Sequence, residues 1–209
     1  VDKMGFSDRN LREIKSIAEK PYGIILCVGP TGSGKTTTLH SVLGYINTPD
    51  IKIWTAEDPV EITQYGLRQV QVHSKIGFTF AAAMRAFLRA DPDVIMVGEM
   101  RDKETADTGI EASLTGHLVL STLHTNSAVE TITRLLDMGC DSFSFADAML
   151  GVLAQRLARR ICKECREAYP PTKEEYEELR LGYGPDYWDT LGVTFDANFR
   201  LYRGKGCDT

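Results

Sequence analysis

Eight consecutive residues have the types and the spacing of a phosphate-binding loop. They are Gly29-Pro30-Thr31-Gly32-Ser33-Gly34-Lys35-Thr36, a complete match to G-x-x-x-x-G-K-[ST]. Glycines let the backbone turn successive N–H groups toward phosphate oxygens at the positive end of a following helix. Lys35 would add a cation for the β and γ phosphates, Thr36 would ligate Mg²⁺, and Thr37 would contact the α phosphate. The alternative is a glycine-rich turn that only joins a strand to a helix.

Acidic residues that could act on a bound triphosphate follow two apolar runs. Glu99 comes just after the run 94–97, where it could orient the attacking water. Gly98 stands where such a strand usually ends in a metal-binding aspartate. We therefore expect Glu57 and Asp58 to supply the carboxylates near the metal, with Asp58 in the outer shell of Mg²⁺. The alternatives are a solvated glutamate at position 99 and an isolated acidic turn before Pro59.

Two histidines, His117 and His124, bracket the apolar run 118–123. If this run is extended, seven steps of ~3.3 Å hold the two imidazoles too far apart to share a metal. His124 would lie at the carboxyl end of the strand, where it could hydrogen-bond the γ phosphate or its water. The alternative for His124 is a structural histidine.

The elements that must position these residues alternate between strands and helices. Short apolar runs predict strands at 24–28, 51–55, 94–97 and 118–122. Helical composition predicts helices at 7–20, 79–89, 102–114 and 129–138. The alternation indicates an α/β fold with a mostly parallel sheet, whose strands have their carboxyl ends at one edge.

The character of the sequence changes near Gly151, and we place a domain boundary after residue 160. Residues 152–160 are expected to form a helix that ends in three arginines. Cys162, Cys165 and a double-proline break follow it. Thr172 and Glu175 have the spacing of a capping box, which predicts a short acidic helix at 173–179. The expected division is thus 1–160 and 161–209.

Composition excludes several classes of protein. The chain has 209 residues, of which 43% are hydrophobic and 25% charged, as in an ordinary globular domain. Its net charge of -5 argues against a surface built to hold nucleic acid. No apolar run approaches the roughly 20 residues that a membrane span requires. Val1 opens no basic-then-apolar secretion signal, so we expect an intracellular protein. Five cysteines are an odd set without the density of a disulfide scaffold, so we expect reduced thiols.

Four motifs, taken in order, resemble those of the secretion ATPases, the motors of type II secretion and type IV pilus assembly. The resemblance runs from about Gly5 to about Arg166. The motifs are the phosphate loop (Walker A), 55–61 (the Asp box), 91–102 (Walker B) and 115–126 (the His box). In this family a glycine before the Walker B glutamate is usual.

The resemblance implies a RecA-like P-loop ATPase domain that uses ATP and Mg²⁺ in a homohexameric ring. Such a ring lies in the cytoplasm, peripheral to the inner membrane, and meets the membrane only through an inner-membrane platform protein and other machinery components. We expect no nucleic-acid partner, because the net charge is -5 and the sequence lacks interleaved aromatic residues. The resemblance also implies that Glu99 activates the water. It places Glu57 and Asp58 near the metal and His124 near the γ phosphate.

Arginines at four positions match family arginines that bear on nucleotide or on neighbouring subunits. They are Arg85, Arg89, Arg101 and Arg134. Arg85 and Arg89 are four residues apart on one predicted helix and so share a face, as a phosphate or subunit clamp requires. The alternative is a solvated basic face.

The assembly and secretion branch of the family carries a zinc element with four cysteines. Cys162 and Cys165 would supply its first pair, and Cys207 would open the second. The chain stops one residue before the expected fourth ligand, so we expect a truncated zinc-binding element, with Zn²⁺ in the full-length protein, and missing N-terminal domains. Three thiolates leave tetrahedral zinc one open position, so a water, another ligand or no metal are the alternatives.

These observations favour a motor that couples ATP hydrolysis to pilin or pseudopilin assembly. The alternative is a RecA-like ATPase that translocates DNA, which should carry a basic or aromatic strand-binding surface. A guanine-nucleotide switch should carry an Asn-Lys-x-Asp motif, which the sequence lacks. We therefore expect adenine as the base.

Overall fold

The computed structural model describes residues 1–207 and divides the chain into two compact units. The first unit is Val1–Leu157, and the second begins at Ala158. This division lies three residues before the boundary expected from the sequence. Each unit is described by itself below.

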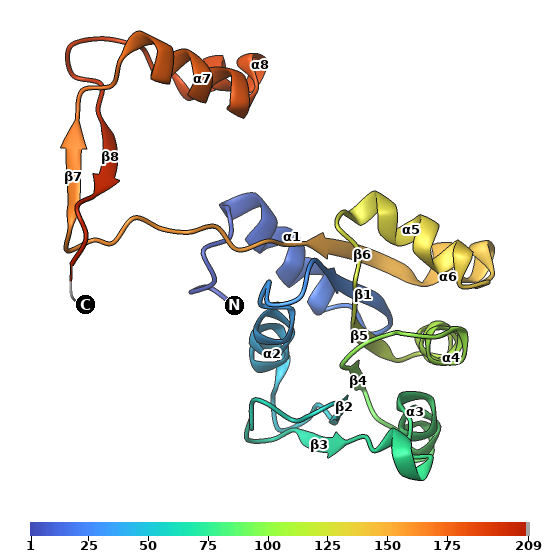
Figure 1. Ribbon diagram of the computed structural model, residues 1–209. Coiled ribbons are helices and arrows are strands. Elements are labelled where there is room, and N and C mark those ends of the chain that lie inside the picture. Colours follow the sequence, from blue (N-terminus) through green and yellow to red (C-terminus); the bar gives the residue numbers. More distant parts are fainter. Residues whose placement is uncertain (208–209) are drawn as a thin grey trace. The chain divides into compact units, whose positions relative to one another are not determined.

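The first unit is built on a sheet of six parallel strands (Figure 1). They are β1 (Gly23–Val28), β2 (Ile53–Glu57), β3 (Arg68–Gln71), β4 (Val94–Val97), β5 (Leu118–Leu123) and β6 (Met149–Ala154). Their order is β3-β2-β4-β5-β1-β6, and every neighbouring pair is parallel. The expected α/β fold with a mostly parallel sheet is confirmed.

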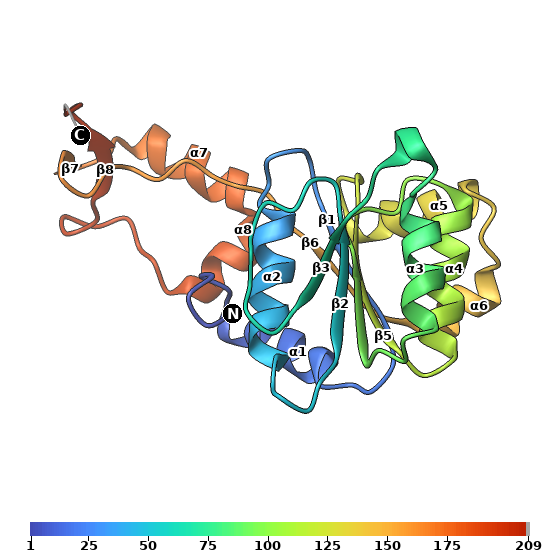
Figure 2. The same cartoon turned by 90° about the horizontal axis from the view of Figure 1, so that it is seen from below.

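Helices cover both faces of this sheet. They are α1 (Asp8–Ala18), α2 (Lys35–Ile46), α3 (Phe80–Leu88), α4 (Lys103–Leu114), α5 (Ala128–Asp137) and α6 (Ser142–Ala148), with a 3₁₀ turn η1 (Ser74–Ile76). Figure 2 shows α1 and α2 on one face and α3 to α6 on the other. None of the helices in residues 1–207 is long and apolar enough to cross a membrane.

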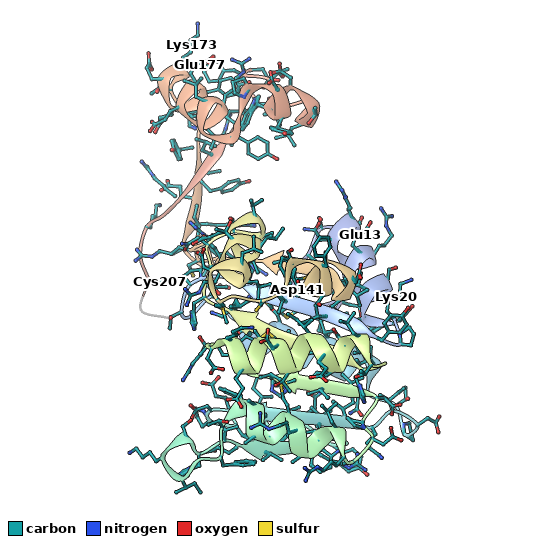
Figure 3. All side chains as sticks on the ribbon, turned by 90° about the vertical axis from the view of Figure 1, so that its right-hand side faces the viewer. Glu13, Lys20, Asp141, Lys173, Glu177 and Cys207 are labelled. Atoms are coloured by element: carbon teal, nitrogen blue, oxygen red, sulfur yellow. The ribbon has the colours of Figure 1, made fainter. Side chains whose placement is uncertain are left out.

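The strands are apolar because both of their faces are covered. In β1, β4 and β5 every residue is buried. Alternate side chains enter two cores: Leu26 and Ile95 pack with α3 to α6, whereas Met96 and Leu120 pack with α1 and α2. Charged side chains such as Glu13 on α1 remain exposed (Figure 3).

Strand β2 lies two residues later than the sequence indicated. It runs over Ile53–Glu57 rather than 51–55, because its register against β4 begins with the pair Ile53 and Val94. Glu57 is therefore the last residue of a buried strand rather than part of a following turn. The sequence also missed β3, whose short polar run Arg68–Gln71 carries no apolar pattern and pairs only with β2.

The expected helix over residues 152–160 is wrong. Residues up to Ala154 form β6, which pairs in parallel with β1 along the sheet edge, and residues 155–160 form no regular structure. Its leucines, alanines and arginines favour a helix locally, but this preference is weak beside backbone pairing with a buried strand. The three arginines of the predicted helix end are exposed in the irregular segment.

The second unit contains a two-stranded antiparallel ribbon and short helices. They are β7 (Arg166–Tyr169), β8 (Leu201–Gly204), α7 (Lys173–Tyr183), α8 (Pro185–Trp188) and a 3₁₀ turn η2 (Asp189–Leu191). The predicted capping box is present: Thr172 Oγ1 accepts from Glu175 N at 3.2 Å, and Glu175 Oε2 accepts from Thr172 N at 2.9 Å. Helix α7 continues four residues past its expected end.

An aromatic cluster forms the interior of this second unit. Tyr176 of α7 packs against Trp188, Phe195 and Phe199. The Tyr176 hydroxyl accepts a hydrogen bond from Trp188 Nε1 at 3.0 Å. Lys173 is labelled on the same helix in Figure 3 and is exposed.

Candidate active site

A cavity of about 530 Å³ lies at the carboxyl edge of the parallel sheet. Its lining comes from the phosphate loop, the start of α2, and the residues that follow β2, β4 and β5. The predicted residues in this lining are Thr31, Gly32, Ser33, Gly34, Lys35, Thr36, Thr37, Glu57, Asp58, Glu99 and His124. Four sequence motifs thus meet at one cavity, because parallel strands end at the same edge.

The phosphate loop needs glycine for two physical reasons. Gly32 and Gly34 have φ angles of 76° and 83°, which side chains disfavour. At Gly29 a Cβ atom would lie 2.2 Å from the backbone oxygen of Gln155, so no side chain fits there. Glycine therefore allows both the turn of the loop and its close approach to the end of β6.

Lys35 and the start of α2 supply the positive charge of the loop. Lys35 is buried, and its Nζ donates to the backbone oxygens of Gly29 at 2.9 Å and Pro30 at 3.0 Å. The first N–H groups of α2 have no acceptor within the helix and carry its positive dipole end. A lysine cation, helix N–H groups and the Thr36 hydroxyl fit a magnesium-bound triphosphate by their donor chemistry.

Gln155 forms hydrogen bonds that hold the phosphate loop and the start of α2. The sequence analysis did not predict this residue as part of the site. Its Nε2 donates to Ser33 O at 2.5 Å, and its Oε1 accepts from Thr38 Oγ1 at 2.8 Å. The residue follows β6 directly, and a strand interpretation of residues 149–154 would have placed it at the same edge as the loop. The mistaken helix at 152–160 concealed that signal.

Glu99 lies between a histidine and an arginine on the wall facing the loop. His124 Nε2 lies 3.0 Å from Glu99 Oε1, and Arg101 Nε donates to Glu99 Oε2. The Arg101 guanidinium also approaches Asp58, with Nη1 3.8 Å from Oδ2. The hydrogen bond to Glu99 raises the pKa of Arg101. Asp58, Arg101, Glu99 and His124 form one chain of charged and polar groups.

Gly98 has a steric reason to be glycine. A Cβ atom here would lie 3.3 Å from the backbone oxygen of Ala56 and 3.5 Å from both Glu57 Cα and the Phe80 ring. The backbone after β4 thus lies close to the end of β2, and a side chain at position 98 would make one tight contact there. The nearby carboxylate comes from the neighbouring strand, at Glu57.

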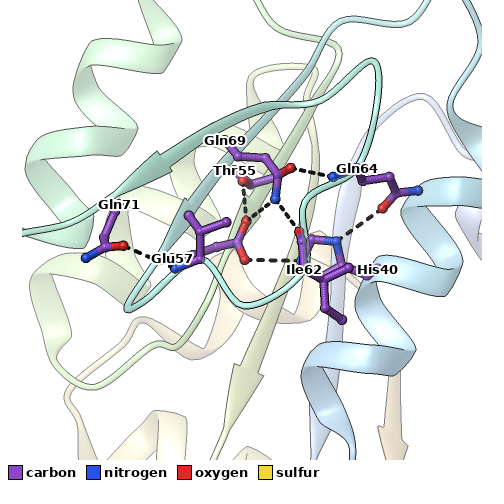
Figure 4. A network of polar contacts seen from close by, with 8 residues as sticks. His40, Thr55, Glu57, Ile62, Gln64, Gln69 and Gln71 are labelled. Carbon is purple, nitrogen blue, oxygen red and sulfur yellow. Dashed lines mark hydrogen bonds and ion pairs between the residues drawn. The ribbon is translucent and has the colours of Figure 1, made fainter.

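Glu57 is 3% exposed and accepts hydrogen bonds from three side chains (Figure 4). Thr55 Oγ1 lies 2.6 Å and Gln69 Nε2 3.0 Å from Oε1, and His40 Nε2 lies 3.1 Å from Oε2. Burial raises the pKa of the Glu57 carboxyl, but these hydrogen bonds outweigh burial and hold the pKa below its ordinary value. The geometry therefore favours an ionised Glu57.

The arginines separate into two groups. Arg101 lines the cavity, whereas Arg85 and Arg89 are not among the described residues that line it. Arg85 lies on α3 and pairs with Glu104 of α4 at 2.7 Å, and both side chains are exposed. Exposed pairs of this kind contribute little to stability. A role for Arg85 and Arg89 toward nucleotide stays a prediction about a neighbouring subunit.

His117 lies at the other end of β5 from His124. Its Nδ1 is 2.9 Å from the backbone oxygen of Ala112, a structural hydrogen bond that closes the turn after α4. The run between them forms the strand β5, so the two histidines flank its opposite ends.

Three cysteines gather in the second unit. The sulfur atoms of Cys162, Cys165 and Cys207 all lie within 4.8 Å of one another, and the first and last are 3.7 Å apart. Two sulfurs on a tetrahedral zinc, with Zn–S bonds of about 2.3 Å, would be separated by about 3.8 Å. The three thiols therefore lie close enough together to supply three ligands to one zinc ion. Cys27 and Cys140 are buried in the first unit.

Comparisons with known proteins point to one family. The family described as "Type II/IV secretion system protein" matches residues 1–209. The type IV pilus assembly ATPase PilB of Myxococcus xanthus is 49% identical over 211 residues, which cover 98% of this chain and 37% of PilB. The type II secretion system protein E of Pseudomonas aeruginosa is 50% identical over 207 residues, which cover 99% of this chain and 39% of that protein. The chain thus spans about two fifths of the length of these relatives.

Solved structures share the same fold. The pilus retraction motor PilT with bound ADP has a TM-score of 0.65 and 32% identity, covering 91% of this chain and 58% of PilT. The VirB11 ATPase of the Brucella suis type IV secretion system, in complex with sulphate, has a TM-score of 0.52 and 28% identity, covering 62% of this chain and 39% of VirB11. The expected RecA-like fold and the resemblance to secretion ATPases are confirmed.

Proposed function

Because the chain belongs to the type II/IV secretion system protein family, we propose that it is the ATPase domain of a motor that hydrolyses ATP to ADP and phosphate. The family supports an ATPase, and the specific reaction is our proposal. One observation carries it: a complete phosphate loop faces the Glu99–His124 pair across a single cavity. The ADP bound by the similar motor PilT agrees with adenine as the base.

The loop would hold the triphosphate through main-chain N–H groups and Lys35. Thr36 would ligate Mg²⁺, which neutralises charge on the β and γ phosphates, and Asp58 would lie in its outer shell. Lys35 would keep its ammonium beside the phosphates, because the backbone oxygens of Gly29 and Pro30 already hold it at the loop.

Glu99 would orient the attacking water and accept its proton. Its side chain is mostly enclosed, with 14% exposed, and its carboxylate contacts His124 through one oxygen and Arg101 through the other. His124 would donate to the γ phosphate or the water from the end of β5. Glu57, buried and ionised, would add negative charge on the metal side of the site.

The names of the relatives suggest where this activity is used. They are ATPases of type IV pilus assembly and proteins of type II secretion, so we propose that hydrolysis drives pilin or pseudopilin assembly. As in our expectation from the motifs, the working form would be a homohexamer at the cytoplasmic face of the inner membrane, bound to a platform protein. Arg85 and Arg89 would then face a neighbouring subunit.

Two substitutions test the proposed reaction. Lys35→Ala should abolish nucleotide binding, since it removes the cation of the loop. Glu99→Gln should keep binding and lower turnover by about 10²-fold or more, since the amide cannot accept a proton from water. Phosphate release and the binding of a fluorescent ATP analogue measure the two effects separately.

Glu13→Gln on α1 is the matched control, because it removes an exposed carboxylate that is not among the described residues lining the cavity. It should bind and hydrolyse ATP as the parent chain does. Hydrolysis at the parent rate by Glu99→Gln would contradict the role of Glu99. A parent chain that does not bind Mg·ATP would contradict the proposed function itself.

A further inference from the structure

A buried histidine lies directly behind Glu57, and no part of the proposed mechanism uses it. We propose that His40 is a positioning residue for the reaction: it fixes the Glu57 carboxylate to the helix that begins at the phosphate loop. This inference rests on the proposed ATPase function. His40 is not among the described residues that line the cavity, so it acts through Glu57 rather than on nucleotide.

The contact is short and enclosed. His40 Nε2 lies 3.1 Å from Glu57 Oε2, and the two side chains are 4% and 3% exposed. Glu57 Oε1 is occupied separately by Thr55 and Gln69. His40 is therefore the side chain that holds the second oxygen in the network that Figure 4 shows. Without it, this oxygen would lose its hydrogen bond inside a buried site.

The ring of His40 is itself held on its other side. The side-chain amide of Gln64 lies 3.1 Å from Nδ1. With its nitrogen toward the ring, this amide donates to Nδ1 and accepts from the backbone N–H of Gly44 at 3.2 Å. Nε2 then carries the hydrogen that is donated to Glu57. In this orientation Gln64 favours the neutral tautomer with its hydrogen on Nε2. When the ring is doubly protonated, the Gln64 oxygen faces Nδ1 instead, and Nε2 still donates to Glu57.

The elements that carry these groups explain what the contact does. His40 lies five residues after Lys35 on α2, whereas Glu57 ends β2 and precedes Asp58. Helix α2, whose first N–H groups face the phosphate site, is therefore also hydrogen-bonded through His40 to Glu57 at the end of β2. A displacement of about 1 Å at a reacting group can cost about 10²-fold in rate. The position of Glu57 relative to the loop thus depends on His40.

Two variants separate this hydrogen bond from simple packing. His40→Leu fills the space with an apolar side chain and removes the donor, and we expect kcat to fall about 10- to 100-fold. The KM for ATP should change by less than about 3-fold, since the loop and Lys35 are untouched. His40→Gln can place an amide N–H near the position of Nε2 and should recover most of the lost kcat.

A double variant tests whether the effect passes through Glu57. In a Glu57→Gln background, His40→Leu should cause little further loss of kcat, because the carboxylate that it positions is already absent. Full additivity of the two losses would overturn the proposal. His117→Leu is the matched control, since this histidine bonds a backbone oxygen at the opposite end of β5. It should leave kcat within about 2-fold of the parent value.

Folding and function are kept apart in the readout. Thermal unfolding and binding of an ATP analogue are measured for each variant, and if His40→Leu does not fold, His40→Asn withdraws the ε donor while keeping a polar side chain. An unchanged kcat in a folded His40→Leu or His40→Asn protein would overturn the inference while leaving the ATPase function intact. Absence of ATP hydrolysis by the parent chain would instead contradict the proposed function.

Discussion

At the residue scale, the two carboxylates of the site differ in how they are held. Glu57 is buried among neutral and histidine donors, whereas Glu99 is partly open and lies between His124 and Arg101. A carboxylate that takes up a proton needs access to water, and one that only supplies charge does not. This difference supports the proposal that Glu99 orients the water and that Glu57 supplies a fixed negative charge.

The buried pair predicts how stability changes with acid. The folded-state pKa of Glu57 lies below its ordinary value, so its contribution to stability is present above about pH 4.3 and is lost as the pH falls through the folded value. The hydrogen bond to Glu57 raises the pKa of His40, whose contribution is fully present below about pH 6.5. Between pH 6 and pH 3.5 the change in the free energy of unfolding that comes from this pair therefore reports on Glu57.

We expect the difference in free energy of unfolding between the parent chain and Glu57→Gln to narrow as the pH is lowered over this range. Urea unfolding at several pH values measures it. Glu13→Gln, on the exposed face of α1, should show a small difference at every pH. A Glu57→Gln difference that stays constant from pH 6 to pH 3.5 would contradict the prediction.

At the scale of elements, β6 matters most for the site. It pairs with β1, the strand that leads into the phosphate loop, and so brings Gln155 against that loop. The pairing explains why Gly29 tolerates no side chain, since the backbone of residue 155 fills the space. The edge strand therefore supplies direct contacts that hold the phosphate loop in its conformation.

Helix α7 offers a test of local stabilisation in the second unit. Thr172→Ala removes the side-chain acceptor at its start and should lower the free energy of unfolding of that unit by about 1 kcal/mol. Trp188 packs on Tyr176 of α7 and reports this transition by fluorescence in a Trp54→Phe background.

Thr194→Ala is the matched control in the same unit, because its hydroxyl makes only a long contact of 3.5 Å to Asp196. It should shift the transition by much less than Thr172→Ala. Equal shifts for the two alanine variants would show that the cap does not stabilise α7.

At the scale of the whole molecule, each unit contains one of the two tryptophans. Trp54 belongs to β2 of the first unit and Trp188 to the second. The two proposed ligands also belong to different units: Mg·ATP to the loop, and zinc to the three cysteines. Fluorescence from each tryptophan can therefore report binding in its own unit.

We expect zinc to raise the melting temperature of the second unit, measured by Trp188 fluorescence. A ligand that binds only the folded state stabilises that state, by about 2.7 kcal/mol when its concentration is 100 times Kd. A chelator should reverse this increase, and it should not change the melting temperature measured by Trp54 fluorescence in the first unit. Zinc content per chain, and the same melts with Cys162→Ser, complete the measurement.

Thiol labelling gives an independent control. Burial raises the pKa of the Cys27 thiol to about 12, so Cys27 should stay unreactive near pH 8 in the folded chain, with or without zinc. The exposed thiols of Cys162 and Cys207 should react only after chelation. Two results together would exclude a structural zinc ion. They are negligible zinc per chain and a melting temperature, measured by Trp188 fluorescence, that changes with neither zinc nor chelator.

Much of the fold could be predicted because its signals are local. The phosphate loop, the strands around Ile24, Ile95 and Leu120, and the capping box at Thr172 each depend on residues close together in the chain. Parallel strands place their carboxyl ends at one edge, so the meeting of Glu57, Glu99 and His124 with the loop also followed from their order.

The amino-acid sequence by itself determined the order of motifs, the class of fold and the family. Only the tertiary structure decided that β6 is a strand, that Gln155 fastens the loop, and that His40 holds Glu57. The physical reason is that these contacts join residues far apart in the chain. Burial and backbone pairing between distant segments outweigh the local preferences that periodicity can detect.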